Sequence, residues 1–158
     1  MRSLDDLDLA ILAELEQNAK IPVSELARRL GSPQSTVRDR IRRLEEEGVI
    51  RNYAAVIDPE KLGLGIKAII EVSRAQHVSL DDFFSEPAQV PEITTVQILT
   101  GDIDELITVY ARDVDHLKEI IYSKVGLLPG LTRMSTTIVL DERSFPLVRR
   151  LGGHAEEE

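Results

Sequence analysis

The stretch Ile21–Ile50, with the sequence IPVSELARRLGSPQSTVRDRIRRLEEEGVI, decides the fold of the first third of the chain. Before Gly31, apolar residues recur at helical spacing and would share one face of a helix: Val23, Leu26, Ala27 and Leu30. Gly31 itself suits the left-handed conformation that commonly ends a helix. The first half of the stretch therefore predicts a short amphipathic helix that ends at Gly31.

A second helix is predicted directly after this glycine. Ser32 stands where an N-cap belongs, and Pro33 suits the first helical position, where a missing N–H costs nothing. Residues at spacing i, i+4 and i+7 give the helix its apolar stripe: Val37, Ile41 and Leu44. Two short helices joined by a tight glycine-containing turn are typical of a helix-turn-helix.

The face of the second helix opposite its stripe is the surface that would enter a DNA major groove. A rotation of about 100° per residue directs Ser35, Asp39 and Arg42 away from the core. Arg40 falls beside the stripe, which predicts a mainly structural role. Arginine and glutamine bind guanine and adenine edges bidentately, and the candidate DNA-binding residues are Ser32, Gln34, Ser35, Thr36, Arg38, Asp39, Arg42 and Arg43. The alternative is an ordinary solvated helical hairpin.

The net charge of the chain is −9, which argues against a nucleic-acid partner until its distribution is considered. Segment 28–51 holds seven arginines against four acidic residues, whereas segment 61–158 holds ten basic and sixteen acidic residues. A local basic patch on an acidic protein can bind DNA, particularly in a dimer, although long-range steering would be weak.

The composition is that of an ordinary globular protein, with 42% apolar and 30% charged residues over 158 positions. This length allows one domain or two small ones. The absence of cysteine excludes disulfides and thiolate metal sites, and there is no apolar run of about 18 residues. Since the N-terminal region is acidic and unlike a signal sequence, we expect an unexported, cytoplasmic protein without a membrane partner.

Further elements are predicted on both sides of the helix-turn-helix. Asp5–Asn18 is expected to be a helix, because its apolar residues recur at helical spacing and acidic residues lie at its start. Val49–Ile57 alternates in part and is expected to form a small β-ribbon, the wing of a winged helix. The DNA-binding domain is therefore placed at residues 1–60.

The pattern changes after Leu62-Gly63-Leu64-Gly65, which resembles a hinge. The elements expected next are strand Ile66–Val72, helix Leu80–Phe84, strand Ile93–Leu99, strand Glu105–Ala111, helix Val114–Val125 and strand Leu131–Leu140. The order β-α-β-β-α-β is the ferredoxin-like arrangement, which makes the predicted fold class α+β. This domain is placed at residues 61–142. Residues 143–158 are expected to form a tail, for which we predict a short helix at Phe145–Leu151 and an acidic, disordered end.

No catalytic or metal site is predicted. The histidines His77, His116 and His154 are scattered and lack the spacing of metal ligands. Phosphate-binding loops and nucleophile motifs are absent from the sequence. Asp102 and Asp104 imitate a carboxylate pair, but the chemistry of a tight turn explains both. We therefore expect neither an enzyme nor a cofactor.

Three segments of the chain resemble the leucine-responsive regulator/AsnC (Lrp/AsnC) family of prokaryotic transcription factors. Their order and separations also match those of the family, and the resemblance covers residues 4–142. The segments are LDDLDLAILAELEQNAKIPVSELARRLG, STVRDRIRRLEEEGVIRNYAAVIDPEKLG, and TGDIDELITVYARD followed by LPGL and TTIVLDE. The resemblance implies a winged helix-turn-helix that binds double-stranded DNA. It also implies a C-terminal domain that pairs through its sheet into homodimers and higher homo-oligomers such as octamers. A dimer predicts a partly palindromic operator.

The resemblance further implies a small effector, often an amino acid, near a turn with a Gly-x-x-Asp pattern. The effector-site candidates are Thr100, Gly101, Asp102, Ile103 and Asp104 in that turn, with Thr136 and Thr137 on the last strand. Family members often carry an aromatic residue within this turn, where the present chain has Ile103, and some members use no effector. The identity of the effector therefore stays open.

Two other classes of function stay open at this stage. One is an oligomeric amino-acid-binding or assembly protein without DNA binding, and the arginine-rich helix argues against it. The other is an enzyme built on the ferredoxin-like domain. The sequence argues against it, because it contains no nucleophile motif, no cofactor-binding loop and no set of metal ligands. Fold alone does not settle function.

Overall fold

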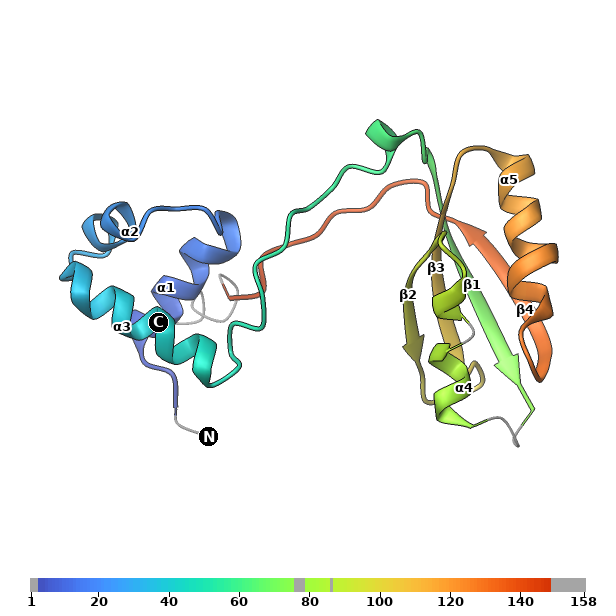
Figure 1. The fold of residues 1–158 in the computed structure, drawn as a ribbon, viewed down its shortest axis with the longest axis horizontal. Helices are drawn as coiled ribbons and strands as arrows, with labels where there is room; N and C mark the ends of the chain where they lie inside the picture. The colour runs from blue at the N-terminus through green and yellow to red at the C-terminus, as the bar shows by residue number, and fades with distance from the viewer. Residues whose placement is uncertain (1–2, 76–78, 86, 149–158) are drawn as a thin grey trace, which may run out of the picture. The chain divides into compact units, whose positions relative to one another are not determined.

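The structure is a computed structural model in which residues 3–75, 79–85 and 87–148 are described (Figure 1). The chain divides into two compact units. Residues up to Val56, together with the segment from Arg143, form the N-terminal unit, and Ile57–Glu142 form the C-terminal unit. Within the described residues, no helix has the length and apolar character needed to cross a membrane.

The N-terminal unit is built on helices α1 (Asp6–Gln17), α2 (Val23–Arg29) and α3 (Gln34–Glu46). Their apolar stripes meet in one core, which consists of Ile11, Ile21, Leu26, Ala27, Val37 and Leu44. Gly31 has a φ of +59°, which confirms the left-handed turn predicted between α2 and α3.

The start of α3 differs from the prediction by one residue. Pro33 has an extended backbone with a ψ of 140°, and its carbonyl accepts the N–H of Val37 at 3.1 Å. Pro33 is therefore the cap residue, and Gln34 occupies the first helical position. Ser32 does not cap α3: its hydroxyl donates to the Leu30 carbonyl at 3.3 Å and so satisfies the end of α2.

The β-ribbon predicted at Val49–Ile57 is not formed. The Ile50 N–H bonds back to the Leu44 carbonyl at 3.0 Å, and the following residues have no regular structure. Val56 is fully exposed. A ribbon requires a second strand that exchanges ladder hydrogen bonds with the first, and no described segment of the chain pairs in this way with residues 49–57.

The C-terminal unit has the predicted β-α-β-β-α-β order. Its elements are β1 (Ile66–Arg74), α4 (Leu80–Ser85), β2 (Ile93–Ile98), β3 (Glu105–Ala111), α5 (Val114–Glu119) and β4 (Leu131–Ile138). Short 3₁₀ turns precede β1 and β2 at Glu60–Leu62 and Pro87–Gln89. The sheet is antiparallel with strand order β2-β3-β1-β4, so β2 and β4 are its edges.

The faces of this sheet differ in burial. Alternate residues of β1 and β3 form the core with residues in and after α5, a set that includes Ala68, Ile70, Val72, Ile107, Val109, Ala111, Leu117, Ile120 and Val125. Figure 1 shows α5 beside the sheet. The other residues of the same strands, such as Ile69, Glu71 and Thr108, stay partly exposed. The single chain therefore leaves one face of its sheet open to solvent.

The helix predicted at Val114–Val125 changes its hydrogen bonding along its length. After α5 it continues as a π-helical turn, Ile120–Lys124, and a 3₁₀ turn, Val125–Leu127. A Cβ on Gly126 would lie 2.8 Å from the Ile121 carbonyl oxygen, so this close approach requires glycine.

The segment after Arg143 packs with the N-terminal helices. The Glu16 carboxylate of α1 accepts the N–H groups of Leu147 at 2.6 Å and Val148 at 2.9 Å. Leu147 and Val148 are helical, but the helix predicted at Phe145–Leu151 is wrong at its start, because residues 145 and 146 have no regular structure. Residues 149–151 lie outside the described residues, as does the acidic end.

Candidate DNA-binding and effector sites

A buried carboxylate, Asp8 of α1, positions α3. Asp8 is 0% exposed, and its Oδ1 accepts Nη1 of Arg40 at 2.9 Å and Nη2 of Arg43 at 2.8 Å. Its Oδ2 accepts the N–H of Asp5 at 3.3 Å, completing a reciprocal capping box at the start of α1. Arg40 also contacts the Asp5 carboxylate, which agrees with the mainly structural role predicted for this arginine. The ion pairs thus fix α3 against α1.

The pKa of Asp8 reports this arrangement. Burial by itself raises the pKa of Asp8. Hydrogen bonds from Arg40 and from the Asp5 N–H, together with the charges of Arg40 and Arg43, lower this pKa by more than burial raises it. The result is a pKa below the ordinary value of 3.8, so the carboxylate is charged at neutral pH.

The exposed face of α3 carries most of the predicted DNA-binding residues. Gln34, Ser35, Arg38, Asp39 and Arg42 are exposed. Arg42 lies 3.6 Å from the Asp39 carboxylate and 3.8 Å from that of Glu46, and its side chain is 68% exposed. Among the described residues Arg38 has no ion-pair partner, which leaves its guanidinium available to a ligand.

The remaining candidates on and near α3 are less accessible. Ser32 and Thr36 are half-buried, and Ser32 is engaged with the end of α2. The side chain of Arg43 is 29% exposed and holds Asp8. Arg43 therefore sits at the edge of the exposed face with its Nη2 already bonded to Asp8, while its Nε has no hydrogen-bond partner among the described residues.

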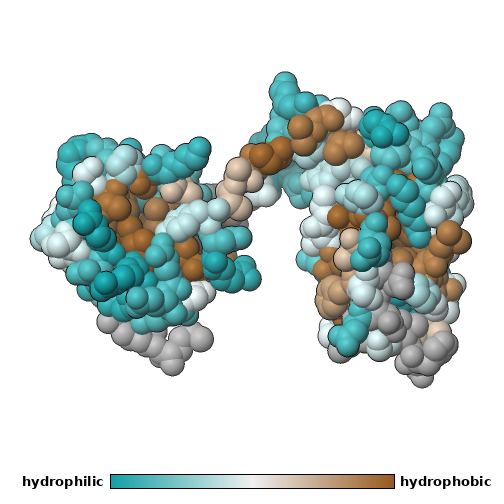
Figure 2. Space-filling model, in the orientation of Figure 1, coloured by the Kyte–Doolittle hydropathy of each residue, from teal (hydrophilic) through white to brown (hydrophobic). Residues whose placement is uncertain are grey.

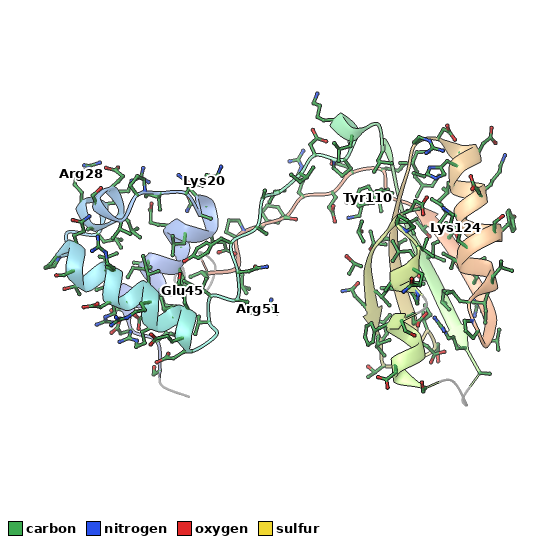
Figure 3. All side chains as sticks on the ribbon, in the orientation of Figure 1. Lys20, Arg28, Glu45, Arg51, Tyr110 and Lys124 are labelled. Atoms are coloured by element: carbon green, nitrogen blue, oxygen red, sulfur yellow. The ribbon has the colours of Figure 1, made fainter. Side chains whose placement is uncertain are left out.

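Acidic neighbours neutralise much of the basic patch seen in the sequence. In α2, Arg28 binds Glu25 at 2.7 Å, and Arg29 binds Glu25 at 2.9 Å and Glu14 at 2.8 Å. The hydrogen bonds from these arginines lower the pKa of Glu25 to about 2. Arg28 and Arg51 are exposed (Figure 3). The positive field of the unit is thus weaker than the arginine count suggests.

Backbone hydrogen bonds hold the predicted effector turn between β2 and β3. Gly101 has a φ of +130°, which favours glycine at this position. The Asp104 carboxylate accepts the N–H of Arg74 at 2.8 Å, while the Asp104 N–H binds the Val72 carbonyl at 3.0 Å. Asp104 is therefore engaged in fixing the turn on β1, and the more exposed Asp102 is the acid that faces solvent.

A buried ion pair lies beneath this turn. Nη2 of Arg74 is 3.0 Å from Oε1 of Glu105, and both side chains are 0% exposed. Arg74 also donates to the Pro129 carbonyl at 3.2 Å. Burial raises the pKa of Glu105, and the charge of Arg74 offsets part of that rise. The sequence analysis did not find this pair. Glu105 is a charged residue at an inward position of its predicted strand, whereas Arg74 lies two residues beyond the end of the strand predicted at Ile66–Val72.

A cavity of about 240 Å³ opens beside the turn, lined by Glu71, Ser73, Asp102, Ile103, Arg133 and Ser135. It includes two of the predicted effector residues, Asp102 and Ile103. The predicted Thr136 and Thr137 do not line it. Because side chains alternate along β4, these threonines lie on opposite faces of the sheet, with Thr136 on the face of Met134.

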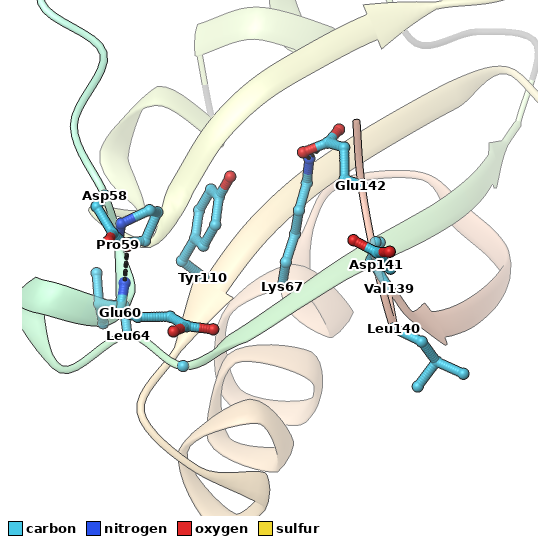
Figure 4. Close-up of a pocket in the computed structure, with 11 residues that line it drawn as sticks. Asp58, Pro59, Glu60, Leu64, Lys67, Tyr110, Val139, Leu140, Asp141 and Glu142 are labelled. Atoms are coloured by element: carbon cyan, nitrogen blue, oxygen red, sulfur yellow. Dashed lines mark hydrogen bonds and ion pairs between the residues drawn. The ribbon is translucent and has the colours of Figure 1, made fainter. Parts of the chain in front are cut away.

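A larger cavity of about 350 Å³ lies at the other end of β1 (Figure 4). Its lining includes Asp58, Glu60, Asp141 and Glu142. Lys67 is the only basic residue among the described residues that line it, and Glu142 binds this lysine at 2.6 Å. Among the described residues, this cavity therefore offers no free cation to a carboxylate-bearing ligand.

A third polar cluster contains the one histidine that the structure describes. The Nδ1 of His116 accepts the Arg112 N–H at 3.2 Å, and its Nε2 lies 3.3 Å from Glu92, which also binds Lys124 at 2.6 Å. No group of three possible metal ligands occurs among the described residues. His77 and His154 lie outside that part of the chain.

Comparisons with known proteins identify both units. Residues 4–51 match the model of a winged helix-turn-helix DNA-binding domain, and residues 67–145 match that of the Lrp/AsnC ligand-binding domain. An HTH-type transcriptional regulator of Pyrococcus abyssi is 36% identical over 146 residues, which cover 92% of each protein. The chain belongs to the Lrp/AsnC family of transcriptional regulators.

Other similar proteins agree with this result. The proline dehydrogenase transcriptional activator of Rhodobacter capsulatus is 33% identical and is aligned over 87% of this chain and 91% of its own length. A Neisseria meningitidis transcriptional regulator, solved as a complex with L-Met, is 28% identical with a TM-score of 0.85. That alignment covers 92% of this chain and 96% of the Neisseria chain. This Lrp/AsnC protein is thus a transcriptional regulator with a DNA-binding and a ligand-binding domain, and not an enzyme.

Proposed function

We propose that this Lrp/AsnC regulator binds a specific operator through the exposed face of α3. The guanidinium of Arg38, which has no ion-pair partner among the described residues, supports this proposal most directly. It lies on the face that a helix-turn-helix presents to the major groove, where arginine binds guanine bidentately. Gln34, Ser35, Asp39 and Arg42 flank it on the same helix. Arg43 and Ser32 would meet phosphates at the edge of the contact, with Thr36 beside them.

We further propose that the regulator acts as a homodimer or a higher homo-oligomer such as an octamer. A single small helix-turn-helix contacts few base pairs, so specific binding favours two copies on a partly palindromic operator. The partly exposed face of the C-terminal sheet and its edges β2 and β4 would be covered by such assembly. Exposed apolar residues outside the cores support the same view: Val56 is 100% exposed, Ile57 60% and Leu140 96%. Figure 2 shows hydrophobic residues, coloured brown, at the surface of each unit.

The proposed effector is an amino acid bound at the turn that contains Gly101 and Asp102. The supporting observations are the cavity beside this turn and the Neisseria relative solved with L-Met. A zwitterion needs both a cationic and an anionic partner, and the cavity lining includes both kinds of side chain. The alternative, an assembly protein without DNA binding, predicts no preferred DNA sequence.

The experiment that tests this function is selection of bound duplexes from a random pool, with and without each of the twenty amino acids. We expect enrichment of partly palindromic sites whose half-sites lie about one helical turn, or a multiple of it, apart. Sedimentation of the full chain at micromolar concentration should give at least a dimer. A pool without enrichment, or a strictly monomeric chain, would contradict the proposal.

A further inference from the structure

The segment 143–148 belongs to the N-terminal unit, although it follows the C-terminal unit in the sequence. The C-terminal unit consists of Ile57–Glu142, and the residues on both sides of it belong to the N-terminal unit. The chain therefore passes from one unit to the other twice, once after Val56 and once after Glu142. The ligand-binding unit is thus joined to the DNA-binding unit at both of its ends.

One carboxylate of α1 holds the returning segment. Oε1 of Glu16 accepts the N–H of Leu147 at 2.6 Å, and Oε2 accepts the N–H of Val148 at 2.9 Å. Each carboxylate oxygen takes one donor, and a hydrogen bond to a charged acceptor is stronger than one between neutral groups. Val148 is half-buried and lines a cavity of about 300 Å³ together with Leu12 and Leu15 of α1. The segment therefore has a specific polar anchor on the surface of α1.

The two connections meet at each end. In the C-terminal unit, Lys67 near the start of β1 binds Glu142, which follows β4, at 2.6 Å. The cavity around this pair is also lined by Asp58, on the first connection (Figure 4). In the N-terminal unit, Val148 lines the same cavity as residues 49–54. Both connections therefore join the same region of one unit to the same region of the other.

Both connections are short and irregular. Along the sequence, residues 55–57 separate the two cavities on the first connection, and residues 143–147 separate them on the second. Residues 51–58 and 139–146 contain neither helix nor strand. A single connection of this kind lets a unit rotate about it, because each residue has two soft dihedral angles. A second short connection beside the first opposes that rotation.

We propose that the segment 143–148 is a latch: held by Glu16, it restrains rotation of the DNA-binding unit and so fixes the half-site spacing that the regulator accepts. The latch docks on the helix whose Asp8 binds Arg40 and Arg43 of α3, about two turns further along α1. Because Glu16 is exposed, water competes for its hydrogen bonds and the latch can open. This inference rests on the operator binding by a homodimer proposed above.

The test is equilibrium binding of the full chain to duplexes that carry the selected half-sites at different spacings. Glu16→Gln keeps the shape of the side chain but replaces one acceptor oxygen with an amide nitrogen that cannot accept an N–H. Leu147→Pro removes one donor from the other side of the contact, and proline suits this position because Pro146 before it is not helical. Asp6→Asn is the matched control, since it removes an equal charge from an exposed position of α1 outside the contact.

The latch predicts a strict spacing in the wild type. Moving the half-sites apart by about five base pairs, half a helical turn, should weaken binding at least about tenfold. In Glu16→Gln and Leu147→Pro this penalty should fall below about threefold. Both variants should also bind the best duplex about three- to tenfold more weakly, because a freely rotating unit has a lower effective concentration at its half-site.

Two controls separate the latch from a general effect of charge or folding. Asp6→Asn should keep the spacing profile of the wild type. The double variant of Glu16→Gln and Leu147→Pro should match the single variants, because both changes break the same contact. Glu16 and Leu147 are exposed, so we expect all these variants to stay folded.

The possible failures are distinguishable. A wild-type spacing profile in Glu16→Gln and Leu147→Pro overturns the latch and leaves operator binding standing. An equal change in Asp6→Asn, or additive losses in the double variant, also overturns the latch alone. If the wild type prefers no palindromic duplex at any spacing, the proposed binding of an operator by a homodimer is wrong, and the latch is wrong with it.

Discussion

Replacement of Asp8 by asparagine tests the ion-pair network that fixes α3. The Asp8 side chain is 0% exposed, whereas Arg40 is 24% and Arg43 is 29% exposed. Asparagine keeps the shape and one oxygen, which at the Oδ1 position can still accept from both arginines, but it loses the negative charge, and the amide nitrogen at the Oδ2 position cannot accept the Asp5 N–H. A hydrogen bond to a charged group contributes about 1.5–3 kcal/mol, and removal of one partner of a buried pair costs about 3–5 kcal/mol. Because water can reach both arginines, we expect a loss of about 2–3 kcal/mol.

The assay is urea and thermal unfolding of the full chain, followed by circular dichroism. A domain of this size loses about 4–8 °C of Tm per kcal/mol, so the N-terminal transition of Asp8→Asn should fall by at least about 8 °C. Asp6→Asn is the matched control, because Asp6 is an exposed residue in the same helical turn. If the two variants agree within about 0.5 kcal/mol, the network does not stabilise the unit.

The stability difference between the wild type and Asp8→Asn depends on pH, because the pKa of Asp8 is lowered in the folded state. A carboxyl group with a lowered pKa in the folded state contributes its full stability above the ordinary pKa of about 3.9. That contribution is lost as the pH falls through the folded-state pKa. The stability difference between the wild type and Asp8→Asn should therefore be constant near neutral pH and shrink as the pH falls below about 4.

Three other substitutions test separate features of the structure. Glu105→Gln should destabilise the C-terminal unit by about 3 kcal/mol in urea, because it leaves a buried guanidinium without a counter-charge; a loss below about 1 kcal/mol would contradict this. Gly126→Ala should cost about 1–3 kcal/mol in thermal unfolding, since the new Cβ would lie 2.8 Å from a backbone carbonyl oxygen, and an unchanged Tm would refute the close approach. Glu16→Ala should speed hydrogen exchange at the Leu147 and Val148 amides by about tenfold, and unchanged exchange would exclude the proposed docking.

Helical and strand periodicity predicted most of the fold. Glu105–Ala111 is the strand expected, and α1 differs from its expected range by one residue at each end. The start of α3 was wrong by one residue because proline generally favours the first helical position, whereas here it is the cap. Only the hydrogen bond from the Val37 N–H to the Pro33 carbonyl shows this. The β-ribbon was wrong because alternation describes one strand and carries no information on its partner.

The charged contacts were the features that sequence could not place. Asp8 lies more than thirty positions from Arg40 and Arg43, at sequence separations of 32 and 35. Its position in an acidic first turn indicated only an interaction with the helix dipole. Likewise, the buried ion pair of Arg74 and Glu105 forms only because β1 pairs with β3. Pairing between distant strands depends on the whole fold and leaves no local pattern.

The measurement that tests the central claim most directly is equilibrium binding of the full chain to DNA. Fluorescence anisotropy is recorded with a duplex selected from the random pool and with a shuffled duplex, over a series of salt concentrations. Arg38→Gln is compared with Arg28→Gln, an exposed arginine of α2 that is paired with Glu25. We predict that the wild type prefers the selected duplex and that Arg38→Gln weakens this binding by about 1–3 kcal/mol, while Arg28→Gln has little effect. Equal affinity for both duplexes, or equal affinity of both variants for the selected one, would contradict DNA recognition through α3.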